Sequence, residues 1–423
     1  MPVHVPTSDI APVRDRLARS RCVTRRLNPS DIRADVIEKI SCIAVGLVGR
    51  RQRRCDAGRH GGHVDPGTDS RGDLHPGRLQ QRKWRYTTGH GGAGRRQSQR
   101  RHRRPDLGRI WGGSDDNRLY FDYLGTLGSS ISNDVGDLQG LDNIEAYDTS
   151  KLYSAWYQHD FGQSGVMLRI GKQDWNALFD TLDAAGVFIN SSFGLDATTA
   201  VSNVSQYPTT AVGAVARWQG DSGAYAMASV FDGTPGLPGH PAGTHIAFHA
   251  HDGVFTSAET GMTGGGDKPY KLAVGGWYQT ADYHDPAGRL RDHDSGFYII
   301  GQDRLIGGPA TPKVDVFAQI SGTQSDRNPL NRYLGAGVDV TGLVPERPDD
   351  VLGLAVARAH AASVYRDATP DTNRAETAIE LTYQLPVNQY VTLQPDMQYI
   401  VHPGVDRSTG NATVVGLRGQ LTW

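Results

Sequence analysis

The sequence predicts an all-β protein, a transmembrane antiparallel β-barrel, from three observations. About 14 segments after residue 116 alternate apolar and polar residues, mostly over roughly 9 to 13 positions, the length of a tilted strand in a bilayer. The connections between them are alternately long and short, as in outer-membrane barrels. No apolar run approaches the roughly 18 residues of a spanning helix, which excludes a helical membrane protein.

Charge divides the chain into two parts. Residues 1–112 carry 25 Lys+Arg against 10 Asp+Glu, whereas residues 113–423 carry 19 against 35. All three cysteines also precede residue 113, and a cysteine-free second part suits passage through an oxidising periplasm. We therefore expect a basic segment over 1–112 and the barrel over 113–423.

The basic segment, residues 1–112, keeps neither helical nor strand periodicity. We expect it to be disordered, or to be the product of a frameshift near residue 112, because Arg- and Gly-rich sequence gives way abruptly to patterned strands. The run ISCIAVGLVG (40–49) lies too far from the N-terminus to be a signal peptide. The export signal that a barrel requires is therefore expected to have been lost or mistranslated.

Two other functions were considered for this basic segment. Arginine clusters suit a nucleic-acid arm, and a zinc site is conceivable from Cys22, Cys42, Cys55, His60 and His63. The cysteines lack the paired CxxC spacing of structural zinc sites. We predict neither a nucleic-acid partner nor a metal.

The expected strands follow one another along the second part. They cover residues 117–126, 151–160, 165–173, 210–219, 223–232, 246–262, 270–281, 294–306, 313–324, 332–342, 349–361, 375–386, 391–402 and 412–423.

The last expected strand shows the alternation that outer-membrane barrels need. Its apolar face carries Leu417, Leu421 and the terminal Trp423, and its polar face carries Arg418 and Gln420. A terminal aromatic ring at the membrane interface suits the closing strand of a barrel. We expect Leu421 and Trp423 to act as the signal for the outer-membrane assembly machinery.

The polar faces of the other strands carry charge, and a barrel of this strand number should hold water. These faces would then line a solute path. The candidates for that lining are Arg169, Arg217, Lys271, Trp277, Asp315, Phe317, Asp339, Glu376, Glu380, Asp396 and Arg418.

The longest connection, residues 174–209, is expected to fold into the lumen and narrow it, since so long a loop in a compact fold is usually functional. Its candidate constriction residues are Asp174, Asn176, Phe179, Asn190 and Phe193.

Several segments resemble the carbohydrate-selective outer-membrane porins of the OprB family. They are VGDLQGLDNIEA (135–146), LYSAWYQHDF (152–161), LRIGKQDWNALF (168–179), FINSSFG (188–194) and LQPDMQYIVHPGV (393–405), followed by the closing GLRGQLTW. The resemblance covers about residues 117–423. Trp423 stands where the family usually closes on Phe, and residues 1–112 match neither the family's signal peptide nor its first strands.

The resemblance implies a sixteen-stranded barrel in the outer membrane of a Gram-negative bacterium, with carbohydrates and outer-membrane lipid as partners. It implies passive diffusion of glucose-like sugars without a cofactor or any bond being broken. Charged side chains can replace the hydration of sugar hydroxyls, and Trp277 and Phe317 can stack on sugar rings. Monomer and homotrimer both stay open.

Three alternatives remain. A barrel hydrolase would use a histidine of His245, His249 or His251 with Ser229 or Ser257, but no G-x-S-x-G motif accompanies them. A soluble structural or adhesive β-protein would fold without detergent. A truncated, non-functional barrel would transport nothing.

Overall fold

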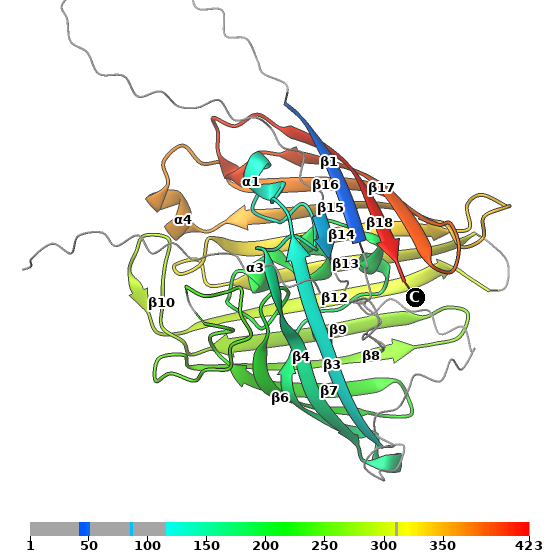
Figure 1. Ribbon diagram of the computed structural model, residues 1–423, viewed down its shortest axis with the longest axis horizontal. Coiled ribbons are helices and arrows are strands. Elements are labelled where there is room, and N and C mark those ends of the chain that lie inside the picture. Colours follow the sequence, from blue (N-terminus) through cyan, green and yellow to red (C-terminus); the bar gives the residue numbers. More distant parts are fainter. Residues whose placement is uncertain (1–41, 51–84, 88–115, 238, 309–311, 423) are drawn as a thin grey trace, which may run out of the picture. The chain divides into compact units, whose positions relative to one another are not determined.

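The computed structural model describes residues 42–50, 85–87, 116–237, 239–308 and 312–422. All of them belong to one of the two units of the chain, Lys39–Trp423, which is described here by itself. Its strands form a closed antiparallel barrel in which sequence neighbours pair, apart from the small hairpin β10–β11 (Figure 1). The predicted fold class is confirmed.

The wall strands are long and regular. Their bounds are β1 Cys42–Arg50, β2 Arg85–Thr87, β3 Asn117–Leu127, β4 Thr149–Asp160, β5 Val166–Gln173, β6 Ala211–Gln219, β7 Ala224–Asp232, β8 Val254–Gly264, β9 Tyr270–Gln279, β12 Asp294–Ile306, β13 Lys313–Thr323, β14 Leu330–Thr341, β15 Val351–Ala361, β16 Ala375–Pro386, β17 Val391–Val401 and β18 Ala412–Leu421.

Most predicted strand bounds agree with these to within two residues, and one prediction was wrong. The strand expected over 246–262 begins only at Val254. A turn precedes it, in which His249 N donates to Asp252 Oδ2 at 2.6 Å and Gly253 has a φ of 61°. A positive φ favours glycine and is incompatible with a continuing strand, so the turn sets the start of β8.

The basic segment contributes two strands, β1 and β2, where the sequence predicted none. β1 pairs with β18 over nine residue pairs, from Cys42 with Gln420 to Arg50 with Ala412, and also pairs with β2, which pairs with β3. The seam is short, because β2 pairs with β1 over three residue pairs and with β3 over two. Main-chain pairing of this kind requires no sustained side-chain pattern. This explains how residues 42–50 join the sheet although the segment around them shows no strand periodicity.

The two ends of the barrel differ, as the loop lengths predicted. Figure 1 shows the long connections with α4 and β10 at one end, and the tight turns and the end of β18 at the other. The short elements in the connections are α1 Ser132–Val135, η2 Gly162–Ser164, η3 Ala184–Val187, α2 Ser191–Gly194, α3 Ala197–Ala200, β10 Tyr283–His284, β11 Leu290–Arg291, α4 Ser363–Ala368 and η4 Pro403–Val405.

Side chains alternate between the two faces of the wall as predicted. On β9, Leu272 and Val274 are exposed on the outward face, whereas Ala273 and Trp277 are buried on the inward face. On β18, Val415 and Leu417 are exposed and Val414 is buried. The outward face is therefore apolar and the inward face carries the polar groups. In the part of the chain described, no helix is long and apolar enough to span a membrane.

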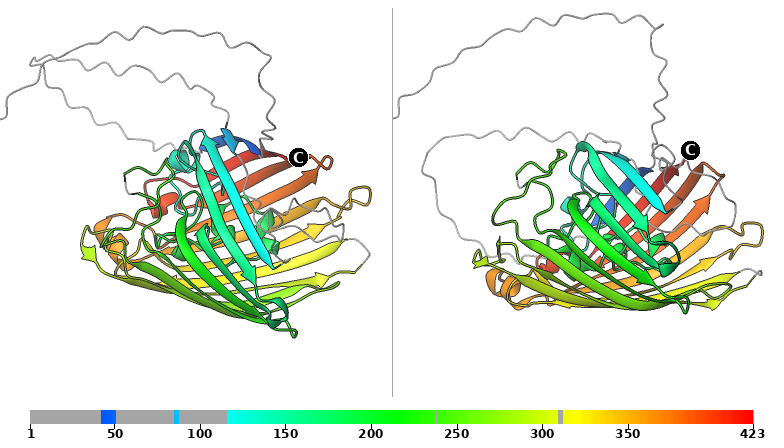
Figure 2. Two further views of the ribbon diagram at one scale, coloured as in Figure 1. Left: turned by 60° about the horizontal axis from the view of Figure 1, so that its bottom comes forward. Right: turned by 90° about the horizontal axis from the view of Figure 1, so that it is seen from below.

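Two connections return into the barrel, β3–β4 and β5–β6. Figure 2 shows the green β5–β6 connection, with its helical turns, among the strands that surround it. Hydrogen bonds join both connections to the inward faces of β16 and β17. These two connections position the candidate site.

Candidate channel and its constriction

The β5–β6 connection, residues 174–209, is built from three short helical turns. Asn190 begins α2, and its side-chain oxygen accepts a hydrogen bond from Ser192 N at 3.1 Å. Asp196 begins α3 and accepts from the backbone N–H groups of Thr198 and Thr199. Asn and Asp are strong N-cap residues because their side chains satisfy otherwise unpaired backbone donors. The connection is thus an ordered element rather than a loose loop.

Aromatic rings fasten this connection to the wall at two places. Trp175 stacks on Phe179 with ring centroids 5.1 Å apart, and its indole N–H donates to Ser257 Oγ on β8. Further along, Phe188 and Phe193 both pack against Phe317 on β13. All these rings are buried, so the connection is held by hydrophobic packing that excludes water.

Glu380 on β16 anchors the middle of the connection. Its carboxylate oxygens accept from Ile189 N at 2.6 Å and Asn190 N at 2.9 Å. Asn190 Nδ2 also donates to Gln398 Oε1 on β17, and Gln394 Nε2 donates to Val187 O. The predicted insertion of 174–209 into the lumen is therefore supported by contacts to two strands far away in sequence.

Glu376 and Arg418 hold the other inserted connection, between β3 and β4. Glu376 accepts from Leu138 N at 2.9 Å and from Gly404 N at 2.7 Å. Arg418 on β18 donates to Asp142 and forms an ion pair with it at 2.5 Å. In this way two of the predicted lumen residues fix a connection instead of facing open water.

Of the predicted constriction side chains, three are buried and the other two are held by hydrogen bonds. Phe179, Asn190 and Phe193 are all buried, and Asn176 Nδ2 donates to Phe179 O and Gly194 O within the connection. Asp174 accepts from the Tyr153 hydroxyl at 2.5 Å. These contacts shape and fix the connection, and the part of these residues in narrowing the channel stays a prediction.

Six of the predicted lumen residues point inward but lie beneath the inserted connections or in the wall. They are Trp277, Phe317, Asp339, Glu376, Glu380 and Asp396, all buried. Trp277 Nε1, for example, donates to Thr199 Oγ1 on the connection. Strand alternation predicted their inward orientation, but it carries no information about what covers the inner face of a strand.

The predicted cations Arg169, Arg217 and Lys271 belong to a continuous inward-facing belt on β3 to β9. Its first members are Tyr120 and Trp156, which stack with centroids 5.0 Å apart, and the Arg169 guanidinium, 4.0 Å from the Trp156 ring. Arg169 also donates to Gln158 Oε1 at 2.8 Å. Cation–π contact and the hydrogen bond hold the guanidinium in a fixed position.

The belt continues on β6 to β9. Arg217 and Lys271 both lie over the Tyr225 ring, at 5.3 and 5.8 Å from its centroid. Lys271 forms an ion pair with Glu259 at 3.4 Å, and the hydroxyls of Tyr225 and Tyr298 also donate to that carboxylate. The cation–aromatic belt is hereafter Tyr120, Trp156, Arg169, Arg217, Tyr225, Glu259 and Lys271.

Sequence reasoning missed four belt members, Tyr120, Trp156, Tyr225 and Glu259. A register shift between Asp122 and Tyr123 places Tyr153 and Trp156, three positions apart on β4, both toward the interior. Strict alternation cannot give that result, because a bulge adds one residue to one strand of a pair.

The opposite wall is acidic. Asp315 on β13 pairs with Asp339 on β14 in the strand register, and Arg304 donates to both oxygens of Asp315 at 2.6 and 2.7 Å. Asp396, Glu376 and Glu380 follow on β16 and β17. The inward face is therefore electrically asymmetric, with a cationic side on β5, β6 and β9 and an acidic side on β13 to β17.

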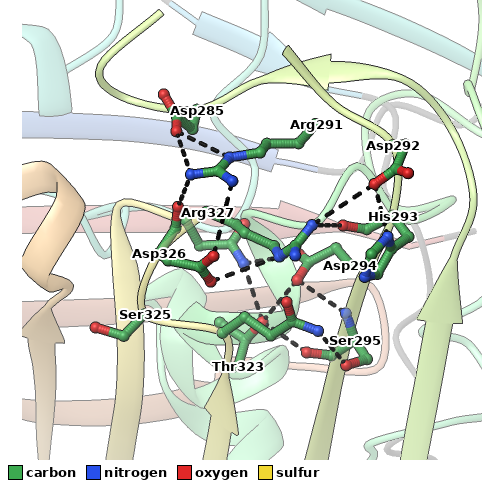
Figure 3. A network of polar contacts seen from close by, with 12 residues as sticks. Asp285, Arg291, Asp292, His293, Asp294, Ser295, Thr323, Ser325, Asp326 and Arg327 are labelled. Carbon is green, nitrogen blue, oxygen red and sulfur yellow. Dashed lines mark hydrogen bonds and ion pairs between the residues drawn. The ribbon is translucent and has the colours of Figure 1, made fainter. Parts of the chain in front are cut away.

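A polar network stiffens the barrel rim at the long-loop end (Figure 3). Burial alone would raise the pKa of Asp285, but hydrogen bonds from the backbone and guanidinium of Arg289 and from Arg291 lower it to about 2. Arg291 also donates to Asp326 O at 2.8 Å, and Arg327 donates to His293 O at 2.9 Å. The β10–β11 hairpin is thus tied to the β13–β14 turn.

The histidines of the hydrolase alternative do not form a catalytic site. His249 and His251 lie on an exposed connection, paired with Asp252 at 3.0 Å and with Asp282 at 3.1 Å. Ser229 and Ser257 are buried on the inward face and bond to each other at 2.7 Å. Across the described ranges no group of ligands suited to a metal ion occurs; Cys22, Cys55, His60 and His63 lie outside them.

A closed barrel with an apolar outward face, a charged inward face and an inserted constriction has the geometry of a porin. The family model for "Carbohydrate-selective porin, OprB family" matches residues 103–423. The chain belongs to this OprB family. Membership in this family places the chain among channels rather than enzymes, which excludes the hydrolase alternative. Membership also places the barrel in the outer membrane of a Gram-negative bacterium.

Two individual proteins show the same relationship. Porin B of Pseudomonas aeruginosa is 25% identical over 188 residues, which is 37% of this chain and 41% of that protein. The chain thus spans about two fifths of the length of this curated relative. The high-pH structure of Pseudomonas putida OprB superposes with a TM-score of 0.67 at 18% identity, covering 91% of this chain and 94% of that chain. This structural likeness shows the shared barrel fold.

Proposed function

We propose that this OprB-family chain mediates passive diffusion of glucose-like carbohydrates across the outer membrane. The observation that carries the proposal is the cation–aromatic belt, which faces the interior on the side opposite the acidic wall. Family membership supports the substrate class, because the matching family is that of carbohydrate-selective porins.

The chemistry of the belt suits a sugar. Sugar hydroxyls both donate and accept hydrogen bonds, so guanidinium donors such as Arg169 and Arg217 can replace donors lost from the hydration shell, while carboxylates such as Asp315 accept. Aromatic rings at the same level offer apolar contact to the C–H faces of a sugar ring. Among the predicted lumen residues, we propose that Arg169, Arg217, Lys271 and Asp315 contact the solute.

Titration of glucose against ion current through the protein in a planar bilayer tests this proposal. The belt predicts concentration-dependent reduction of the current, weaker in Trp156→Ala and Arg169→Ala than in wild type. A matched control is Trp218→Ala, which removes an exposed, outward-facing tryptophan on β6. Equal glucose effects in wild type and both belt variants would overturn the assignment.

Three further proposals concern assembly and chain organisation. We propose that Leu421 and Trp423 form the signal that the outer-membrane assembly machinery recognises. Leu421 is exposed on the outward face, and Trp423 lies outside the described residues. A homotrimer would bury some outward strand faces in place of lipid, and the mass of the detergent-solubilised protein tests this.

We also propose that the chain divides near residue 112. The family match, which begins at residue 103, supports a boundary in this region, whereas β1 and β2 precede it and pair within the barrel. Translation of the gene upstream of the Gly113 codon in all three frames tests the frameshift hypothesis: another frame encoding a signal peptide and alternating strands would support it.

A further inference from the structure

Three basic side chains lie together on the outward face of β14 and β15. Arg332 pairs in register with His360, and Leu334 with Arg358. Leu334 and Val356, two positions from these arginines on the same faces, are exposed large apolar residues. Arg332, Arg358 and His360 therefore project from the barrel toward the surrounding membrane, and they are called the outer basic cluster.

Among the described residues, the two arginines of this cluster have no acidic partner. Neither Arg332 nor Arg358 forms an ion pair with any residue that the structure describes, and Arg358 Nη1 donates only to the Thr377 hydroxyl, at 3.1 Å. His360 lies within electrostatic range of both arginines and of Arg366 on α4. On β14 and β15 their outward neighbours Leu334, Leu354 and Val356 are exposed apolar residues. Cations on a lipid-facing surface are unfavourable, so a concentrated group of them indicates an anionic ligand.

A groove runs from the outer basic cluster onto the apolar wall. It has a volume of about 760 Å³, and its lining includes Arg332 and His360 together with Phe297, Ile320 and Leu334. Gly322 lies opposite Arg332, and a Cβ there would come within 3.0 Å of the Phe297 ring. The missing side chain leaves room beside the arginine, so the groove has one basic end and one apolar side.

The position of the cluster along the strands selects the ligand. Arg332 is the third residue of β14, and His360 is the penultimate residue of β15, so both lie at the long-loop end, which is the external end of an outer-membrane barrel. A ligand there meets water and external headgroups on one side and acyl chains on the other. Arginine is suited to bidentate phosphate recognition.

We propose that the outer basic cluster binds a phosphate group of an anionic glycolipid in the outer leaflet, with an acyl chain of that lipid along Phe297, Ile320 and Leu334. This inference rests on the membrane location of the barrel and is independent of the proposed sugar transport. Each arginine near an anionic membrane surface strengthens binding about fivefold, so loss of both should weaken it about 30-fold.

Binding is measured by native mass spectrometry of the full chain in detergent, titrated separately with a diphosphorylated lipid A-type glycolipid, its dephosphorylated analogue and inorganic phosphate. The variants are Arg332→Gln and Arg332→Gln/Arg358→Gln. Lys268→Gln is the matched control, since it removes one exposed cation from the β8–β9 turn at the opposite end. Heat-modifiable migration on gels checks that each variant is folded; removing outward charges should not destabilise the barrel.

We expect the diphosphorylated glycolipid to bind wild type and Lys268→Gln equally. Compared with wild type, it should bind the single variant about fivefold more weakly and the double variant about 30-fold more weakly. The dephosphorylated analogue should bind all four weakly and alike. Equal binding of the diphosphorylated lipid to all four proteins would overturn the proposal. So would wild-type binding of the dephosphorylated analogue or of inorganic phosphate with the same Kd as the phosphorylated lipid.

Discussion

Replacement of Glu380 by alanine tests whether the β5–β6 connection constricts the channel. The change removes the carboxylate that accepts from two buried donors, Ile189 N at 2.6 Å and Asn190 N at 2.9 Å. A buried donor without a partner costs roughly 1 to 3 kcal/mol, so the two together cost roughly 2 to 6 kcal/mol. Glu380 lies beside the carboxyl group of Asp396, and removal of one of two crowded carboxyl groups offsets part of this cost, which favours the lower end of this range.

A loss of about 2 to 3 kcal/mol shifts the equilibrium between seated and released connection about 30- to 150-fold. Single-channel conductance in planar bilayers measures the result. We expect Glu380→Ala to show a larger or more frequently fluctuating conductance, and Glu380→Gln, which keeps one acceptor oxygen, to show an intermediate effect. The control is Ile379→Ala, an exposed neighbour on the opposite face of β16.

If Glu380→Ala folds, as judged by heat-modifiable migration, and conducts like Ile379→Ala and wild type, then Glu380 does not hold the constriction closed. The remaining contacts of the connection, such as Asn190 with Gln398 and the rings of Phe188 and Phe193 on Phe317, would then suffice on their own.

Three other predictions follow from the same contacts. Arg418→Ala should destabilise the barrel by about 3 kcal/mol, because Asp142 loses its buried partner; thermal unfolding in detergent measures this, and a variant as stable as wild type would contradict it. Burial, and next the charge of Asp196, raise the pKa of Asp180 well above its usual range. The protonated form is therefore favoured in the folded state, and stability is lost as pH rises through the folded pKa, so conductance of wild type should rise with pH over that titration. Asp180→Asn should abolish that rise, and an unchanged pH profile would refute the assignment. Burial likewise raises the pKa of Asp137 to about 6, so its contribution to stability is complete below about pH 4 and lost as pH rises through 6. Asp137→Asn should remove this pH dependence of the unfolding temperature, which thermal scans at pH 4 to 7 measure.

The strands were predictable because each one alternates under a strong physical constraint. On β9, Leu272 and Val274 face lipid, whereas Lys271 and Trp277 face the interior. Apolar and polar positions therefore alternate with a period of two residues along the strand. The same constraint gave the inward orientation of Glu380 on β16. The entry of the connection 174–209 into the lumen was predicted from its length, because so long a loop in a compact fold is usually functional.

The contacts inside the barrel were not predictable in the same way. Glu380 meets Ile189 across 191 positions of sequence, and Gln398 meets Leu141 across 257. No local pattern encodes such pairs, so residues predicted to line open water proved to be buried anchors. The strand β1 was missed for a related reason: its pairing with β18 and β2 depends on main-chain groups that every residue carries.

Swelling of liposomes that contain the purified, refolded protein tests the central claim most directly. In an isotonic glucose solution the proposed pore predicts swelling faster than that of protein-free liposomes, with rates that fall as the monosaccharide is replaced by longer oligosaccharides. Swelling no faster than that of protein-free liposomes, from protein shown to be folded by heat-modifiable migration, would contradict the claim that this barrel conducts sugars.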